Sequence, residues 1–193
     1  MGLGISLQGG YDSTNAWSRN IGSNVTVIAN SNSIITVTSP VGSTSTTVID
    51  GFTIQNNLVS GLIRQGIYNS GSSPTISNNT ITGGAGFGNN YGIYNLSGSS
   101  PAISNNTITG GSGTNNGTIG CYGIYNSSSS PVISNNTITG GSGNSSINYG
   151  IYNDVSSPTM LNNTITGGSG GGTTNYGIIN VSTSSSSVIS NNT

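Results

Sequence analysis

Few side chains in this sequence could act as an acid, a base or a nucleophile in catalysis. The 193 residues include no His, Lys or Glu. Apart from tyrosine, the ionisable side chains are Asp12, Asp50, Asp154, Arg19, Arg64 and Cys121. A Ser-His-Asp relay or a transition-metal site cannot be assembled from this set, because each needs His or several Cys. We therefore expect a protein that is not an enzyme and that uses no cofactor or metal.

The composition also argues against charged partners. The net charge is −1 with two basic residues, whereas phosphate backbones and anionic membranes are bound by clustered positive charge. The glycine-rich run 167–172 lacks the lysine and the following helix of a phosphate-binding loop. No apolar segment has the length of a spanning helix. We expect no nucleic-acid partner and no membrane insertion. The start lacks a charged n-region and a long apolar h-region, so a secreted protein would be present here in mature or truncated form.

The order in the sequence comes from an internal repeat. Its clearest copy, residues 91–110, reads YGIYNLSGSSPAISNNTITG, and copies recur from residue 66 onward. They align on Pro74, Pro101, Pro131, Pro158 and Ser187, which are 27, 30, 27 and 29 residues apart. Such a period indicates a solenoid, in which each unit buries its apolar face against its neighbours. The copies differ in length mainly between Gly-Gly and the next Gly-Ile-Tyr-Asn, so we expect the insertions at one corner.

Each copy has the pattern of short strands. Its apolar residues are two apart, which is the period of a β-strand, and Ser-Gly, Asn-Asn and Gly-Gly pairs between them favour turns. We expect an all-β parallel solenoid with three strands per coil, 22–30 residues per coil and roughly seven to eight coils. Residues 1–50 would form less regular entering coils, with Trp17 covering the first, and residues 51–193 the regular repeats of the same domain.

Stacking of coils about 4.8 Å apart would place equivalent residues in columns. We expect three inward aliphatic columns. They are Ile54, Ile76, Ile103, Ile133, Met160 and Ile189; Val59, Ile81, Ile108, Ile138 and Ile165; and Ile67, Ile93, Ile124, Ile151 and Ile178. Asp50 and Asp154 would then lie about four coils, or nearly 20 Å, apart, which is too far for a hydrolytic carboxylate pair.

Asparagine is expected to hold the corners, because its amide can bond both the backbone and the next coil. The expected structural ladder is Asn78, Asn105, Asn135, Asn162 and Asn191, and a second corner carries Asn69, Asn95, Asn126, Asn153 and Asn180. Eleven asparagines stand in N-x-Ser/Thr patterns, so glycan attachment is the alternative. The candidate glycosylation sites are Asn116 and Asn144 in the variable loops, and Asn95 and Asn126.

Two outward columns are candidate binding surfaces. The threonine ranks are Thr80, Thr82, Thr107, Thr109, Thr137, Thr139, Thr164 and Thr166. The tyrosine stripe is Tyr68, Tyr94, Tyr125 and Tyr152. Threonine is also a common outward strand residue, and aromatic ladders can simply stabilise adjacent strands. Both columns therefore have a structural alternative.

The pattern Gly-Ile-Tyr-Asn, Ser-Ser, Pro-x-Ile-Ser-Asn-Asn-Thr-Ile resembles the right-handed parallel β-helix repeat of the pectate-lyase-like superfamily, especially its bacterial secreted and cell-surface proteins. The resemblance implies the hand of the coil. It leaves activity open, because this scaffold carries lyases, hydrolases, adhesins and inert stalks. Lyases of this fold use an Arg or Lys base with acidic residues that hold calcium, and this sequence has no such cluster.

Our leading hypothesis is a non-catalytic extracellular structural protein, a rod or filament subunit on a prokaryotic cell surface that associates end to end. The chain stops inside a repeat, so it is either a fragment or a subunit whose open strand edges receive another copy. The first alternative is an adhesin or carbohydrate-binding module that uses the tyrosine stripe. The second is an ice-binding protein that uses the threonine ranks.

Overall fold

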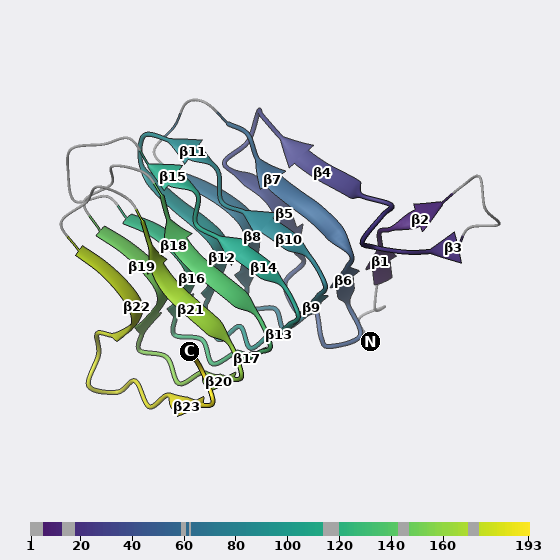
Figure 1. Ribbon diagram of the computed structural model, residues 1–193. Helices are drawn as coiled ribbons and strands as arrows, with labels where there is room; N and C mark the ends of the chain where they lie inside the picture. The colour runs from purple at the N-terminus through teal and green to yellow at the C-terminus, as the bar shows by residue number, and fades with distance from the viewer. Residues whose placement is uncertain are drawn as a thin grey trace.

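The computed structural model describes residues 6–12, 18–58, 61, 63–113, 120–142, 147–169 and 174–193. The chain winds into a solenoid of parallel strands, and successive coils add one strand each to three sheets (Figure 1). No helix occurs in these ranges. The prediction of an all-β parallel solenoid with three strands per coil is confirmed. The array is somewhat shorter than the seven to eight coils expected, since two of its sheets hold six strands.

The strands alternate between the sheets along the chain. The first sheet contains β1 (Ser6–Gln8), β6 (Val48–Asp50), β9 (Thr75–Ser77), β13 (Ala102–Ser104), β17 (Val132–Ser134), β20 (Thr159–Leu161) and β23 (Val188–Ser190). The second contains β4 (Thr26–Asn30), β7 (Phe52–Asn56), β10 (Thr80–Thr82), β14 (Thr107–Thr109), β18 (Thr137–Gly141) and β21 (Thr164–Gly168). The third contains β5 (Ile35–Ser39), β8 (Ile63–Ser70), β12 (Asn89–Leu96), β16 (Gly120–Ser127), β19 (Ile147–Asp154) and β22 (Thr174–Asn180).

Two small pairs complete the architecture. The strands β11 (Ala85–Gly86) and β15 (Ser112–Gly113) pair in parallel beside the second sheet. The strands β2 (Tyr11–Asp12) and β3 (Ser18–Arg19) form an antiparallel hairpin that projects from the first coil (Figure 1). Because β4, β5 and β6 already join the three sheets, the first fifty residues are more regular than the sequence suggests. Trp17 lies outside the described residues.

The core consists of three aliphatic columns in strict register. The first runs through Ile49, Ile76, Ile103, Ile133, Met160 and Ile189. The second runs through Ile28, Ile54, Ile81, Ile108, Ile138 and Ile165. The third runs through Val37, Ile67, Ile93, Ile124, Ile151 and Ile178. Most of these side chains are fully buried, so identical residues pack on one another along the axis.

The expected place of Ile54 in the first column is wrong. Ile54 lies on β7 and pairs with Ile81 in the second sheet, while Ile49 on β6 takes the place beside Ile76. The segment around Ile54 resembles the Ile-Ser-Asn-Asn segment in letters, but β6 has already supplied the first-sheet strand of that coil. Gly51, with φ of 77°, then turns the chain into β7. Val59 lies outside the described residues.

A glycine in every third-sheet strand except β5 lets the chain bend without a side chain. At Gly123, an added Cβ would lie 2.6 Å from the carbonyl oxygen of Gly150 and 2.6 Å from Cγ2 of Ile138. The glycine therefore faces the interior, as does the next residue, Ile124, which is fully buried. Two consecutive inward residues break the alternation of the strand. Tyr122 and Tyr125, three residues apart, consequently share its outer side, where their rings are in contact.

Candidate functional site

The second asparagine of each Asn-Asn pair forms a buried ladder between the first and second sheets. Asn106 donates from Nδ2 to Oδ1 of Asn136 at 3.0 Å and to the carbonyl oxygen of Ile76 at 3.0 Å, while its Oδ1 accepts from the Asn79 backbone N–H at 2.9 Å. The same arrangement continues through Asn79, Asn106, Asn136, Asn163 and Asn192. This ladder satisfies buried amides inside the corner.

The predicted ladder at the first asparagine of each pair is therefore wrong by one residue. Those residues adopt left-handed φ values of 53–57°, which turn the chain sharply between two strands and leave the side chain at the surface. Asparagine tolerates this conformation better than most residues. The residues concerned are Asn78, Asn105, Asn135, Asn162 and Asn191.

The ladder expected at the other corner is confirmed. Each side chain donates from Nδ2 to Oδ1 of the next, at 2.8, 2.8, 2.8 and 2.9 Å. The members are Asn69, Asn95, Asn126, Asn153 and Asn180. Asn95 and Asn126 are fully buried with their amide nitrogens engaged, so the structure contradicts their prediction as glycosylation sites. The other two candidates, Asn116 and Asn144, lie outside the described residues.

Tyrosines form two adjoining columns on the outer side of the third sheet. One is the predicted stripe of Tyr68, Tyr94, Tyr125 and Tyr152, whose members are half-buried. The other is Tyr91, Tyr122, Tyr149 and Tyr176, with ring centroids 4.9, 4.9 and 5.5 Å apart and interplanar angles of about 10°. Edge-to-face contacts join the two columns, as between Tyr122 and Tyr125 at 5.2 Å. Most ring faces therefore contact another tyrosine.

Burial makes the phenols of Tyr91, Tyr122 and Tyr125 hard to ionise. Desolvation raises the pKa of Tyr125 to about 12, with further contributions from neighbouring Tyr152, Tyr94 and Asp154. Desolvation, followed by the surrounding tyrosines, also raises the pKa values of Tyr91 and Tyr122 well above the ordinary value. These three phenols therefore stay neutral near pH 7.

The threonine ranks lie on the outer side of the second sheet, as predicted. Thr80, Thr107, Thr137 and Thr164 are paired in register, and so are Thr82, Thr109, Thr139 and Thr166. The intervening isoleucines are buried. The preceding strand, β7, continues the two ranks with Thr53 and Gln55. The result is a regular surface of methyl and hydroxyl groups, about 4.8 Å apart between strands.

A polar trough lies beside the threonine ranks. It has a volume of about 540 Å³. Its lining includes Gln55, Asn57, Thr82, Thr109, Ser112 and Ser142. No charged residue lines it, so it offers hydrogen-bonding groups without an electrostatic attraction for ions.

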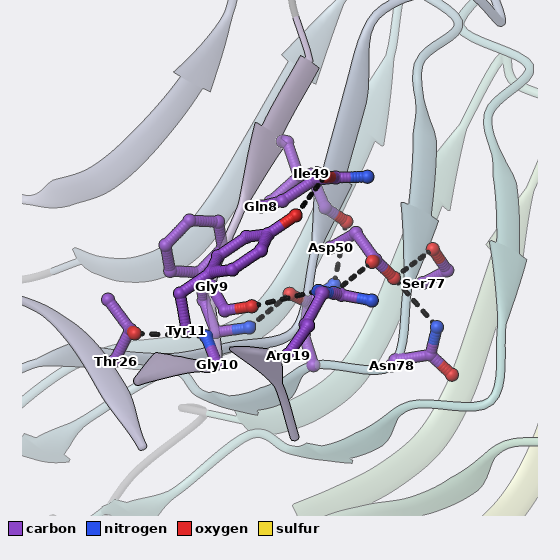
Figure 2. A network of polar contacts seen from close by, with 12 residues as sticks. Gln8, Gly9, Gly10, Tyr11, Arg19, Thr26, Ile49, Asp50, Ser77 and Asn78 are labelled. Carbon is purple, nitrogen blue, oxygen red and sulfur yellow. Dashed lines mark hydrogen bonds and ion pairs between the residues drawn. The ribbon is translucent and has the colours of Figure 1, made fainter. Parts of the chain in front are cut away.

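Asp50 anchors a polar network at the N-terminal end of the solenoid (Figure 2). Its carboxylate forms an ion pair with Nη2 of Arg19 and accepts hydrogen bonds from Oγ of Ser77 at 2.6 Å and Nδ2 of Asn78 at 2.7 Å. Arg19 also donates from Nε to the carbonyl oxygen of Gly9 at 3.0 Å. Burial alone would raise the pKa of Asp50, but the hydrogen bonds from Ser77 and Asn78 and the Arg19 charge outweigh it and lower the pKa. This carboxylate is held ionised in a structural role.

The sequence does not predict a further column, which is buried except at its last member, Asn175. Arg64, Asn90, Cys121, Asn148 and Asn175 are paired in register on the third sheet. Each stands three residues before the isoleucine of Gly-Ile-Tyr-Asn, and that spacing could have revealed the column. Arg64 is fully buried and donates to the carbonyl oxygens of Leu58 at 2.6 Å and Phe87 at 2.8 Å. Burial lowers the pKa of its guanidinium.

Among the described residues, no three or more His, Cys, Asp or Glu side chains lie close enough together to hold a metal ion. Asp50 lies on the first sheet and Asp154 at the end of a third-sheet strand, and the side chain of Asp12 is outside the described residues. Among the described elements, none is a helix long and apolar enough to traverse a bilayer. The arrangement is therefore dominated by repeated ladders.

Comparison with protein families matches residues 3–193 to the family described as a right-handed beta helix region. Searches among curated proteins and among solved structures gave no match. The match covers nearly all of the sequence and agrees with the parallel solenoid, its three sheets and its in-register columns. This chain belongs to the right-handed β-helix family.

Proposed function

We propose that the chain is a non-catalytic structural protein, a stiff extracellular rod on a prokaryotic cell surface. The observation that carries this proposal is the set of continuous ladders along the axis. Asparagine, tyrosine and isoleucine each contact their own equivalents in the next coil. In repeat proteins such nearest-neighbour contacts supply most of the stability, and here they involve most of the distinctive side chains of the repeat.

The charged residues support the same proposal. Arg19 and Asp50 neutralise each other, and Arg64 is buried against backbone carbonyls. A general base must reach the proton that it removes, and a carboxylate with a lowered pKa and three donors is a poor base. These three charged side chains therefore contribute to folding and leave little for chemistry on a substrate.

End-to-end association is the self-interaction that suits this rod. One face of a coil is complementary to the opposite face of the next, because both carry the same columns in the same register. Contact between two such faces is heterologous and does not close, so repeated contact would build a filament.

Immunogold labelling of the source cells combined with negative-stain microscopy tests the proposal. We expect label on the cell surface, and elongated particles or filaments in the purified protein. Label confined to the cytoplasm would contradict the extracellular role. Discrete short particles at high protein concentration would show that the protein does not assemble end to end into filaments. Cleavage of a polysaccharide in a panel of uronic-acid and neutral glycans would overturn the non-catalytic assignment.

A second candidate function, ice binding, is favoured by the register of the threonine ranks. Threonines two residues apart on a strand are about 6.6 Å apart, and strands are about 4.8 Å apart, so the outer face presents a two-dimensional lattice of hydroxyl and methyl groups. Thermal hysteresis and ice shaping are the readouts. Thr137→Leu should abolish both, while Thr159→Leu, on the first sheet, should leave them unchanged. Absence of thermal hysteresis in the unchanged protein would rule out ice binding.

Carbohydrate binding by the tyrosine stripe is the weakest of the three proposals. Sugars pack against exposed aromatic faces, whereas most of these faces contact other tyrosines. A glycan array compared with the double variant Tyr94→Ala and Tyr125→Ala tests it. Hits that disappear in the variant would support an adhesin.

A further inference from the structure

One asparagine per coil is left at the surface of the corner between the first and second sheets. Asn105, Asn135 and Asn162 are exposed and hold left-handed φ values of 57, 56 and 54°. Their side-chain amides take part in no hydrogen bond within the described part of the chain. Each is followed by a ladder asparagine and then by an exposed threonine, which gives the triplets 105–107, 135–137 and 162–164 the pattern N-x-Thr.

The structure separates these three from Asn78, Asn95 and Asn126, which stand in the same kind of pattern. Asn78 has the same position in its coil, but its Nδ2 donates to Asp50 at 2.7 Å. Asn95 and Asn126 are enclosed by the second ladder, with no exposed surface. A sugar on either would have to occupy the space of the adjacent coil. Because the second asparagine of each pair forms the ladder, the first asparagine is the one whose amide can carry a substituent.

We infer that Asn105, Asn135 and Asn162 carry N-linked glycans in a row along this corner. The amide nitrogen bonds to the anomeric carbon of a polyprenyl-diphosphate-linked oligosaccharide. The bond from that carbon to the diphosphate breaks, the diphosphate leaves with the electron pair, and the amide loses one proton. The inference rests on the proposed extracellular role, because the donor and its transferase act on exported chains.

The local geometry suits this modification. The left-handed turn directs the amide away from the core, and the threonine two residues later is exposed on the adjoining strand in all three triplets. The buried asparagine between them keeps its ladder bonds, such as Asn106 Nδ2 to Asn136 Oδ1 at 3.0 Å. A glycan can therefore be present without loss of a contact that holds the coils together.

Glycopeptide mapping of the protein isolated from the surface fraction of its source cells tests the inference. We expect sugar masses at Asn105, Asn135 and Asn162, and none at Asn78, Asn95 or Asn126. Thr137→Val should remove the glycan from Asn135 alone, Thr137→Ser should retain it, and neither should change the unfolding temperature of the deglycosylated protein.

The outcomes separate this inference from the proposed function. A surface-located protein unmodified at all three residues would overturn the inference and leave the structural role standing. An unmodified cytoplasmic protein would overturn both. A sugar on Asn95 or Asn126 would contradict the premise that only exposed asparagines accept a glycan.

Discussion

Arg19 on β3 forms an ion pair with Asp50 on β6, and this contact ties the projecting hairpin to the first sheet (Figure 2). The carboxylate is buried while the guanidinium is partly exposed. Ser77 and Asn78, which belong to the next coil, donate to the other carboxylate oxygen. One side chain thus connects the hairpin, β6 and the turn after β9.

Asp50→Asn should destabilise the N-terminal coils. The asparagine side chain has the same shape, but it lacks the negative charge that pairs with Arg19 and accepts hydrogen bonds from Ser77 and Asn78. A hydrogen bond to a charged group contributes about 1.5–3 kcal/mol. Because Arg19 is partly exposed, we expect a loss of about 2 kcal/mol in the free energy of unfolding, measured by urea denaturation. Asp154→Asn, at a half-buried position, should change it by less than about 0.5 kcal/mol. Equal effects of the two variants would contradict a special role for Asp50.

Acid should remove the stability that the ionised Asp50 carboxylate contributes. The folded state lowers the pKa of Asp50 below its ordinary value of 3.8, so the unfolded chain takes up the proton first as the pH falls. The contribution to stability is present above that value and is lost as the pH falls toward the folded pKa. Urea midpoints measured from neutral to acidic pH should converge for the unchanged protein and Asp50→Asn. A difference between them that is independent of pH would rule out this linkage.

The sequence predicted most of the architecture because strand alternation and repeat period are local properties. Every second residue of a strand faces inward, so the isoleucines alone define three columns. The alternation fails at turns. Ser104 and Asn106 lie on either side of a left-handed residue, and because two identical asparagines follow each other, the letters cannot say which one is inside.

The contacts of the charged residues could not be predicted in the same way. Arg19 and Asp50 are 31 residues apart, on elements outside the clear repeats, so no period relates them. The misplacement of Ile54 has the same origin, since β6 precedes the first well-preserved copy. The threonine ranks and the tyrosine stripe were predictable because their members are adjacent to the isoleucines on the same strands. The stacked column of Tyr91, Tyr122, Tyr149 and Tyr176 was not predicted.

The ladder asparagines should matter far more than their exposed neighbours. Asn106→Ala removes a donor to Ile76 and Asn136 and an acceptor for the Asn79 backbone, all of them buried. Leaving such groups without partners costs about 1–3 kcal/mol each, so we expect a loss of about 3–5 kcal/mol in unfolding free energy. Asn105→Gly is the matched control. Its effect should be within about 0.5 kcal/mol, because glycine adopts the left-handed turn freely. A larger loss of stability for Asn105→Gly than for Asn106→Ala would show that the first asparagine of each pair, not the second, forms the ladder.

The buried column through Cys121 has a weak step that a substitution should repair. Asn90 donates from Nδ2 to Sγ of Cys121 at 3.7 Å, and Oδ1 of Asn90 has no hydrogen-bond partner among the described residues. One coil further along, Asn148 donates to Asn175 at 2.8 Å. Cys121→Asn would offer an oxygen acceptor in register with both neighbours.

We expect Cys121→Asn to raise the free energy of unfolding by about 0.5–1.5 kcal/mol. Cys121→Ala should lower it, because it removes buried contacts and adds no hydrogen bond. Urea denaturation of the two variants under reducing conditions gives the comparison. If the asparagine variant were less stable than the alanine variant, the column would not behave as a hydrogen-bonded ladder.

Alkaline pH should unfold the protein through its tyrosine columns. Tyrosine in an unfolded chain has a pKa of about 10. In the folded state, burial raises the pKa of Tyr125 to about 12 and also raises those of Tyr91 and Tyr122. Above pH of about 10 the unfolded state therefore binds fewer protons than the folded state, so stability falls as the pH rises. The stabilising contribution is complete below pH of about 10 and is lost as the pH approaches 12. The double variant Tyr122→Phe and Tyr125→Phe keeps the rings but cannot ionise at these positions, and its urea midpoint should fall less steeply with pH. Parallel slopes for the two proteins would show that other groups control the alkaline transition.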